Sequence, residues 1–128
     1  MAREEAAQWL RRARSNLQLG KAGRTGGVML EDLCFEIQQA AEKSLKAVLI
    51  NADAQVPRTH ALGLLVQKIE AVVEVPEEVQ RVVELADYAV QTRYPGDYPP
   101  VTNEEYDDAV AIAEAVFDWA ARVVGVQE

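Results

Sequence analysis

The residues best suited to chemistry in this 128-residue sequence are its single histidine, His60, and Arg93. Imidazole is the side chain that gains and loses a proton near neutral pH, so an acid–base role would fall first to His60. The guanidinium of Arg93 can hold a phosphate or an acidic partner through two parallel hydrogen bonds. Each residue also has a structural explanation, His60 as a hydrogen-bonding residue at a helix start and Arg93 as a cation packed over Tyr94.

A second group of polar side chains occurs in the helix predicted over residues 30–51, on the face away from its apolar stripe. Glu42 and Lys46 are four residues apart with the acid first, the favourable order for a helical ion pair, which explains both charges without a ligand. Alternatively, this face binds the phosphate or base of a ligand, or forms part of a dimer interface. The group consists of Gln38, Gln39, Glu42, Lys43 and Lys46.

Other kinds of site are excluded by residue type. One cysteine, Cys34, and one histidine provide neither a disulfide nor a thiol or imidazole metal site. Cys34 falls in an apolar helical stripe, which favours a core residue over a nucleophile. The glycines of residues 20–27 lack the preceding strand of a phosphate loop and the Lys-Ser or Lys-Thr pair that follows its glycines. We therefore expect no metal and no cofactor.

Length and composition predict one folded domain over residues 1–128. Hydrophobic residues make up 49% of the chain and charged residues 27%, the ordinary range of globular proteins. The N-terminal residues include acids instead of the apolar run of a signal peptide, and no stretch approaches the roughly 18 apolar residues of a membrane span. We expect a cytoplasmic protein that does not enter a membrane.

Charge is unevenly distributed along the chain. The formal net charge of −8 disfavours non-specific binding to nucleic acid, which depends on neutralising phosphates with Lys and Arg. Residues 1–24, however, hold six basic and two acidic side chains, whereas residues 70–128 hold three basic and fourteen acidic ones. These are most simply solvated faces. Alternatively, they steer a basic partner toward the C-terminal half or pair one protomer's ends with another's.

Apolar residues recur at steps of three and four, which predicts an all-α, five-helix bundle of mostly antiparallel helices. The predicted helices span about residues 2–19, 30–51, 61–72, 76–90 and 102–124. The glycine-rich segment 20–27 should end the first helix. Thr59 is a candidate N-cap of the third helix, and Pro76 suits the first position of the fourth. Thr102 and Glu105 form a capping box before the fifth.

For two of these helices the apolar periodicity assigns particular residues to the buried face. In the helix over residues 30–51, Leu45 is assigned to the core, and Leu45→Ala should lower the free energy of unfolding by about 2 to 5 kcal/mol. The stripe of the fourth helix is assigned to Val79, Val82, Val83, Ala86 and Val90.

Three segments, in this order, resemble the HEPN domain family, small helical modules found in prokaryotes beside nucleotidyltransferases and in toxin–antitoxin systems. They are Cys34–Leu49, with its Gln-Gln-Ala-Ala-Glu-Lys run, Arg58–Leu62 and Arg93–Pro95. The likeness extends from Trp9 to the alanine-rich last helix. It implies a four- or five-helix bundle, a homodimer, and either a small nucleotidyltransferase partner or a nucleotide ligand.

Some members of this family cleave RNA with an arginine and a histidine that are separated by four to six residues on a late helix. Here His60 has no arginine five to seven positions before it. The positions after Arg93 where a histidine would be expected hold Tyr98, Pro99 and Pro100. We therefore expect no metal-independent RNase activity of the family type, and we favour a protein that is not an enzyme.

Two functions remain open. The first is a non-catalytic HEPN module that dimerises and binds a nucleotide or a nucleotidyltransferase partner in a toxin–antitoxin-like system. The second is a divergent RNA-cleaving toxin in which Arg93 and Tyr98 have taken over the site. The first hypothesis expects Lys46, His60 and Arg93 to meet in one recess. Its candidate ligand-binding residues are Gln39, Glu42, Lys43, Lys46, His60, Arg93 and Tyr94.

Overall fold

A computed structural model of the chain describes residues 2–23, 27–89 and 99–126, and every regular element within them is a helix. Three helices are long: α1 (Ala2–Ala22), α2 (Leu30–Asn51) and α5 (Asn103–Val124). The others are α3 (Leu62–Glu70), α4 (Glu77–Gln80) and the 3₁₀ helix η1 (Arg81–Ala89). Because η1 follows α4 directly, the two form one helical rod, and the predicted all-α, five-helix bundle is confirmed.

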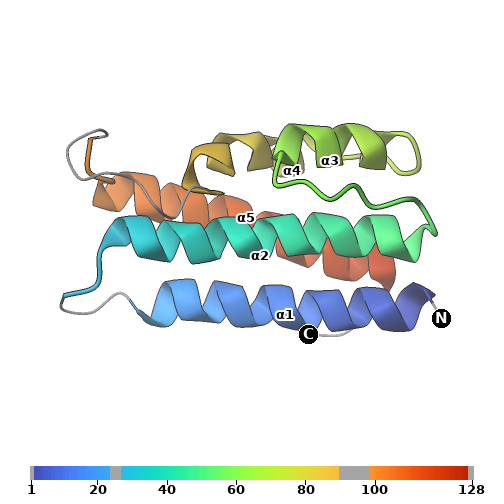
Figure 1. Ribbon diagram of the computed structural model, residues 1–128, viewed down its shortest axis with the longest axis horizontal. Coiled ribbons are helices and arrows are strands. Elements are labelled where there is room, and N and C mark those ends of the chain that lie inside the picture. The colour runs from blue at the N-terminus through green and yellow to red at the C-terminus, as the bar shows by residue number, and fades with distance from the viewer. Residues whose placement is uncertain (1, 24–26, 90–98, 127–128) are drawn as a thin grey trace.

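The helix α2 lies at the centre of the bundle. Figure 1 shows α1 and α2 side by side and antiparallel, with α5 behind them running in the same direction as α2. The elements α3, α4 and η1 form a second layer on the side away from α1. Residues 52–61 leave the end of α2 and return along it before α3 begins. This return brings a loop residue against the middle of α2, where the candidate site is found.

Because α1, α3, η1 and α5 all pack against α2, that helix is buried on more than one side. Leu45 is fully buried, as predicted, but Gln38 (0% exposed) and Glu42 (3%) are buried too. The prediction that these two polar residues face away from the core is therefore wrong. A periodicity argument assigns one buried face to a helix, and it fails for a helix that neighbours surround.

Small residues let α1 approach α2 closely. Ala6, Ala13 and Gly20 recur every seven residues along α1, and all are buried. A Cβ on Gly20 would lie 2.6 Å from Ile37 Cδ1, and the buried Tyr106 hydroxyl donates a hydrogen bond of 2.7 Å to the Gly20 carbonyl. The prediction that α1 ends before residue 20 is wrong, because close packing outweighs the low helix propensity of glycine.

The rod formed by α4 and η1 differs from the predicted fourth helix in its periodicity. A 3₁₀ helix has three residues per turn, so side chains three positions apart lie on the same face. Val82 and Leu85 follow this spacing and are buried, whereas Val83 is 45% exposed and Ala86 is exposed. The stripe predicted through Val83 and Ala86 is therefore wrong. Its last member, Val90, lies outside the described residues.

Helix ends follow the predicted chemistry in part. The capping box before α5 is confirmed, because Thr102 Oγ1 accepts from the Glu105 amide at 3.0 Å and Glu105 Oε1 accepts from the Thr102 amide at 2.9 Å. Pro76, in contrast, is the N-cap of α4 and not its first residue. The helix α3 ends at Glu70, so Val72, the last residue of the predicted third helix, is 50% exposed.

Candidate functional site

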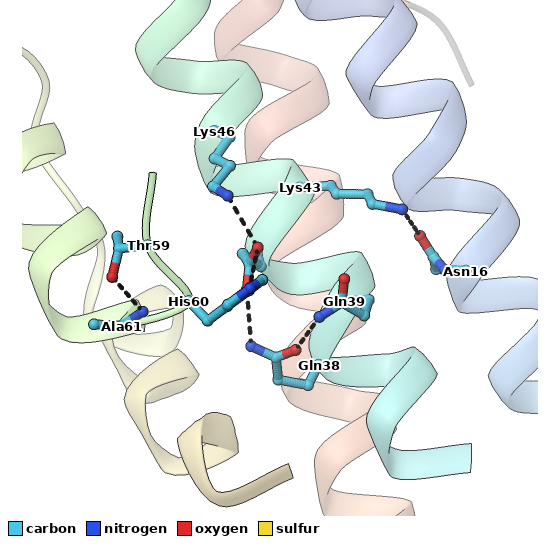
Figure 2. Close-up of polar contacts among 9 residues, drawn as sticks. Asn16, Gln38, Gln39, Lys43, Lys46, Thr59, His60 and Ala61 are labelled. Atoms are coloured by element: carbon cyan, nitrogen blue, oxygen red, sulfur yellow. Dashed lines mark hydrogen bonds and ion pairs between the residues drawn. The ribbon is translucent and has the colours of Figure 1, made fainter. Parts of the chain in front are cut away.

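The buried carboxylate of Glu42 on α2 contacts Gln38, Lys46 and His60, which are labelled in Figure 2. Its side chain is only 4% exposed. Lys46 Nζ donates to Oε2 at 3.0 Å, and Gln38 Nε2 donates to Oε1 at 3.3 Å. His60 Nδ1 lies 2.9 Å from Oε1 and 3.1 Å from Oε2. These donors offset the several kcal/mol that burying an unpaired carboxylate would cost.

We call Gln38, Gln39, Glu42, Lys46 and His60 the Glu42 cluster. Gln39 joins it indirectly, because its Nε2 donates to Gln38 Oε1 at 2.8 Å. The predicted ion pair between Glu42 and Lys46 is confirmed, but it is not a surface pair, since the Lys46 side chain is only 13% exposed. Among the described residues, no buried side-chain nitrogen or oxygen lacks a hydrogen-bond partner.

His60 differs from the rest of the cluster in its exposure, because 72% of its side chain is open to solvent. The turn before α3 positions it. Thr59 Oγ1 accepts from the Ala61 amide at 3.0 Å, and the Thr59 amide donates to the Pro57 carbonyl at 3.0 Å. Ala61, not Thr59, is the N-cap of α3. The cap predicted at Thr59 is therefore wrong, and its hydroxyl shapes the turn that holds the imidazole against α2.

Lys43 points away from the Glu42 cluster, toward α1 (Figure 2). Its Nζ donates to Asn16 Oδ1 at 2.7 Å, and Asn16 Nδ2 donates to Glu36 Oε1 at 2.8 Å. We call these three residues the Asn16 bridge, because they connect α1 with α2. Asn16 was missed in the sequence, although its place next to an apolar residue, the buried Leu17 of α1, was a usable signal.

Of the seven predicted ligand-binding residues, the structure therefore brings four together. Gln39, Glu42, Lys46 and His60 belong to one cluster, whereas Lys43 belongs to the Asn16 bridge. Arg93 and Tyr94 lie outside the described residues, as does Tyr98 of the RNA-cleaving alternative. The convergence of Arg93 with Lys46 and His60 stays a prediction.

The chemistry available to the Glu42 cluster follows from its charges and free atoms. The opposite charges of Glu42 and Lys46 offset each other across their 3.0 Å ion pair. An ammonium group has three N–H donors, of which Lys46 gives one to Glu42. The exposed imidazole has a second nitrogen, Nε2, that Glu42 does not contact. The cluster can therefore hold an anion or a polar ligand at its exposed edge.

Cys34 is fully buried in α2, as predicted for a core residue. Burial raises the pKa of its thiol from 9.0 to about 11, and the negative charges of Glu31 and Glu105 add to the effect. A thiol that stays protonated is a poor nucleophile. Cys34 therefore has no part in the candidate site.

Some of the unevenly distributed charged side chains form ion pairs within the protein. Lys21 on α1 and Glu114 on α5 form an ion pair of 2.6 Å, and this hydrogen bond raises the pKa of Lys21. Arg81 binds Asp108 on α5 at 2.9 Å and Glu84 at 3.1 Å. These pairs join separate helices or neighbouring turns, which accounts for several of the charges by packing.

A hollow of about 350 Å³ lies between η1 and α5, and it shares no residue with the Glu42 cluster. Its lining includes Glu84, Tyr88 and Asp108. Over the described residues, no group of histidine, cysteine or acidic side chains is arranged to hold a metal ion. Within the same residues, no helix combines the length and the apolar character needed to cross a membrane.

Comparison with known proteins agrees with this architecture. The family model of the HEPN domain matches residues 6–124. The crystal structure of TT1696 from Thermus thermophilus is 32% identical with a TM-score of 0.77, over 96% of this chain and 99% of that one. ST0689, an archaeal HEPN homologue, is 24% identical with a TM-score of 0.73, over 93% and 97% of the two chains. No curated protein matches the chain.

The fold and the polar cluster define a small all-helical domain whose central helix carries the groups suited to binding. The family match covers nearly the whole chain, and the first of the two solved structures is similar in sequence as well as in fold. This protein belongs to the HEPN domain family. The resemblance stated from the sequence is confirmed.

Proposed function

We propose that this protein is a non-catalytic HEPN module that binds a nucleotide at the exposed edge of the Glu42 cluster. The observation that supports binding is the convergence of Lys46 and His60 on one buried carboxylate. Glu42 holds both side chains in place before a ligand arrives, which lowers the entropy that binding costs. The nucleotide phosphate would contact Lys46 Nζ and the His60 ring, and the Gln39 amide would contact the base.

The rest of the proposal comes from family membership. HEPN modules that form homodimers beside small nucleotidyltransferases suggest the same assembly for this chain, in a toxin–antitoxin-like system. A non-catalytic role is favoured because the sequence lacks the arginine and histidine spacing of the RNA-cleaving members. Purified protein that cleaves RNA in an Arg93-dependent manner would contradict this part of the proposal.

Ligand binding raises the melting temperature of a protein, so thermal unfolding tests the nucleotide proposal directly. We expect ATP to raise the melting temperature of the wild-type protein and to leave that of His60→Ala unchanged. Asn16→Ala is the matched control, because it disrupts a separate polar network between α1 and α2 and should keep the ATP response. If ATP has no effect on the wild type, or the same effect on His60→Ala, the Glu42 cluster is not the nucleotide site.

The proposed assembly is tested separately. We expect sedimentation equilibrium of the purified chain to give twice the mass of one protomer. A small nucleotidyltransferase encoded by the neighbouring gene should co-purify with the chain and raise its melting temperature. A monomer that binds neither this enzyme nor ATP would remove the support for a binding module.

A further inference from the structure

The buried carboxylate fixes the position of the hydrogen on His60. Both oxygens of Glu42 already accept from donors, Oε1 from Gln38 Nε2 and Oε2 from Lys46 Nζ. A carboxylate in this setting acts as an acceptor, and His60 Nδ1 lies within hydrogen-bond distance of both of its oxygens. His60 Nδ1 must therefore carry a hydrogen, because a lone pair there would face the negative charge of Glu42.

This hydrogen bond has a consequence for the other ring nitrogen. A neutral imidazole has one N–H, and an unrestrained histidine can move it to whichever nitrogen a ligand needs. In His60 the hydrogen is held at Nδ1, so Nε2 of the neutral ring carries a lone pair. A lone pair repels a phosphate oxygen. Only the protonated ring presents an N–H at Nε2, and protonation also makes the Glu42 cluster positive.

We propose that anion binding at the Glu42 cluster takes up one proton at His60 Nε2, so that the affinity for a phosphate group rises as the pH falls from 8 to 6. This inference rests on the proposed nucleotide site and specifies how that site recognises phosphate. His60 contacts the anion through Nε2, Lys46 supplies a second positive charge, and Glu42 is a positioning residue that links binding to protonation.

Of the charged side chains around His60, Glu42 contacts the ring directly and Lys46 contacts Glu42. On α2, the adjacent Lys43 is turned away to Asn16 on α1. On its own segment, the exposed Arg58 is two residues earlier. The helix α3 carries its charges, Lys68 and Glu70, in its last turns, far from its start near His60. On η1, Arg81 and Glu84 pair with each other.

Isothermal titration with ATP at pH 8 and pH 6 tests the linkage. One proton taken up can change an affinity by up to about tenfold per pH unit, and we expect the wild type to bind ATP roughly tenfold or more tighter at pH 6. In Glu42→Gln the amide can donate to Nδ1, which frees the ring to place its hydrogen on Nε2 while neutral. We expect the affinity of Glu42→Gln to change much less between pH 8 and pH 6 than that of the wild type.

Glu42→Gln also corrects for protons bound by ATP itself, because these change both proteins equally. Equal affinity of the wild type at the two pH values, or the same pH dependence in Glu42→Gln, would overturn the linkage and leave the nucleotide site standing. No ATP binding at either pH would instead overturn the nucleotide site.

A second measurement needs no variant and no ligand. His60 is the only histidine in the chain, so its ring gives a single set of signals in a ¹⁵N NMR spectrum of the side chains. At pH 8 we expect Nδ1 to show the shift of an N–H nitrogen and Nε2 that of a lone-pair nitrogen. The reverse assignment, or rapid averaging between the two forms, would show that Glu42 does not fix the hydrogen.

Discussion

Two polar networks leave different sides of α2, and they differ in what they bury and what they expose. The Glu42 cluster surrounds a carboxylate that is 4% exposed and ends in an imidazole that is 72% exposed. The Asn16 bridge consists of three partly buried side chains whose hydrogen bonds join α1 to α2. A network that joins two helices is explained by packing. One that holds a reactive group in solvent gains little stability from that group and is the better candidate for function.

The largest loss of stability is expected from Glu42→Ala, which removes the carboxylate at the centre of the Glu42 cluster. The change leaves Lys46 mostly buried and unpaired, and we expect the free energy of unfolding to fall by about 3 kcal/mol. Urea denaturation at pH 7.5 measures the loss. The matched control is Glu36→Ala in the Asn16 bridge, which removes one acceptor and should cost about 1 kcal/mol. Equal losses would mean that the two networks do not differ in the way proposed.

A smaller effect is expected from Asn16→Ala. Lys43 and Glu36 each lose one hydrogen bond but can reach water, because both are only partly buried, so the loss of stability should be about 1 to 2 kcal/mol. The same urea experiment gives this value. If Asn16→Ala also abolished the ATP response, the two networks would have to be treated as one site.

A still smaller loss of stability is expected from His60→Ala. An exposed side chain that pairs with a carboxylate contributes about 0 to 1 kcal/mol, so the unfolding midpoint should hardly move. The ATP-induced rise in melting temperature should nevertheless disappear. A loss of several kcal/mol would indicate that His60 acts in the structure as a clamp on residues 52–61, and the functional interpretation would fail.

The smallest effect at neutral pH is expected for Cys34, on the apolar side of the same helix. Burial raises the pKa of its thiol to about 11, so native protein at pH 8 should resist iodoacetamide while urea-unfolded protein reacts readily. Because the pKa of the thiol is higher in the folded than in the unfolded protein, its protonation contributes to stability. This contribution is complete below pH 9 and is lost as the pH rises through 11. Cys34→Ala should therefore show a weaker loss of stability between pH 9 and 11 than the wild type. Rapid labelling of native protein would contradict the burial of Cys34.

The bounds of α2 and the capping box before α5 were predictable from the sequence. Thr102, Glu105 and the apolar residues of each helix act over one or two turns, so their effect can be read from neighbouring residues. The ion pair of Glu42 with Lys46 was predictable for the same reason. The composition of most of the candidate site, though not its geometry, followed from the polar residues of α2 and from the single histidine.

The errors occurred where distant segments compete with local preference, or where a helix departs from the α-helical period. Gly20 stays helical because Ile37 and Tyr106 pack against it, and Val83 is exposed because η1 has three residues per turn. Lys43 was assigned to the ligand-binding face, yet Asn16 on another helix holds it. None of these outcomes follows from the residues within one turn of the position concerned.

The sequence by itself determined which segments are helical, where most of them begin and end, and the family to which they belong, because these depend on local side-chain chemistry and on the order of motifs. Only the tertiary structure decided that Glu42 is buried and that His60, eighteen positions later, reaches it. Burial depends on how many helices surround α2. The meeting of the two side chains depends on a connection that turns back along that helix, and neither is encoded in the spacing of residues along a single segment.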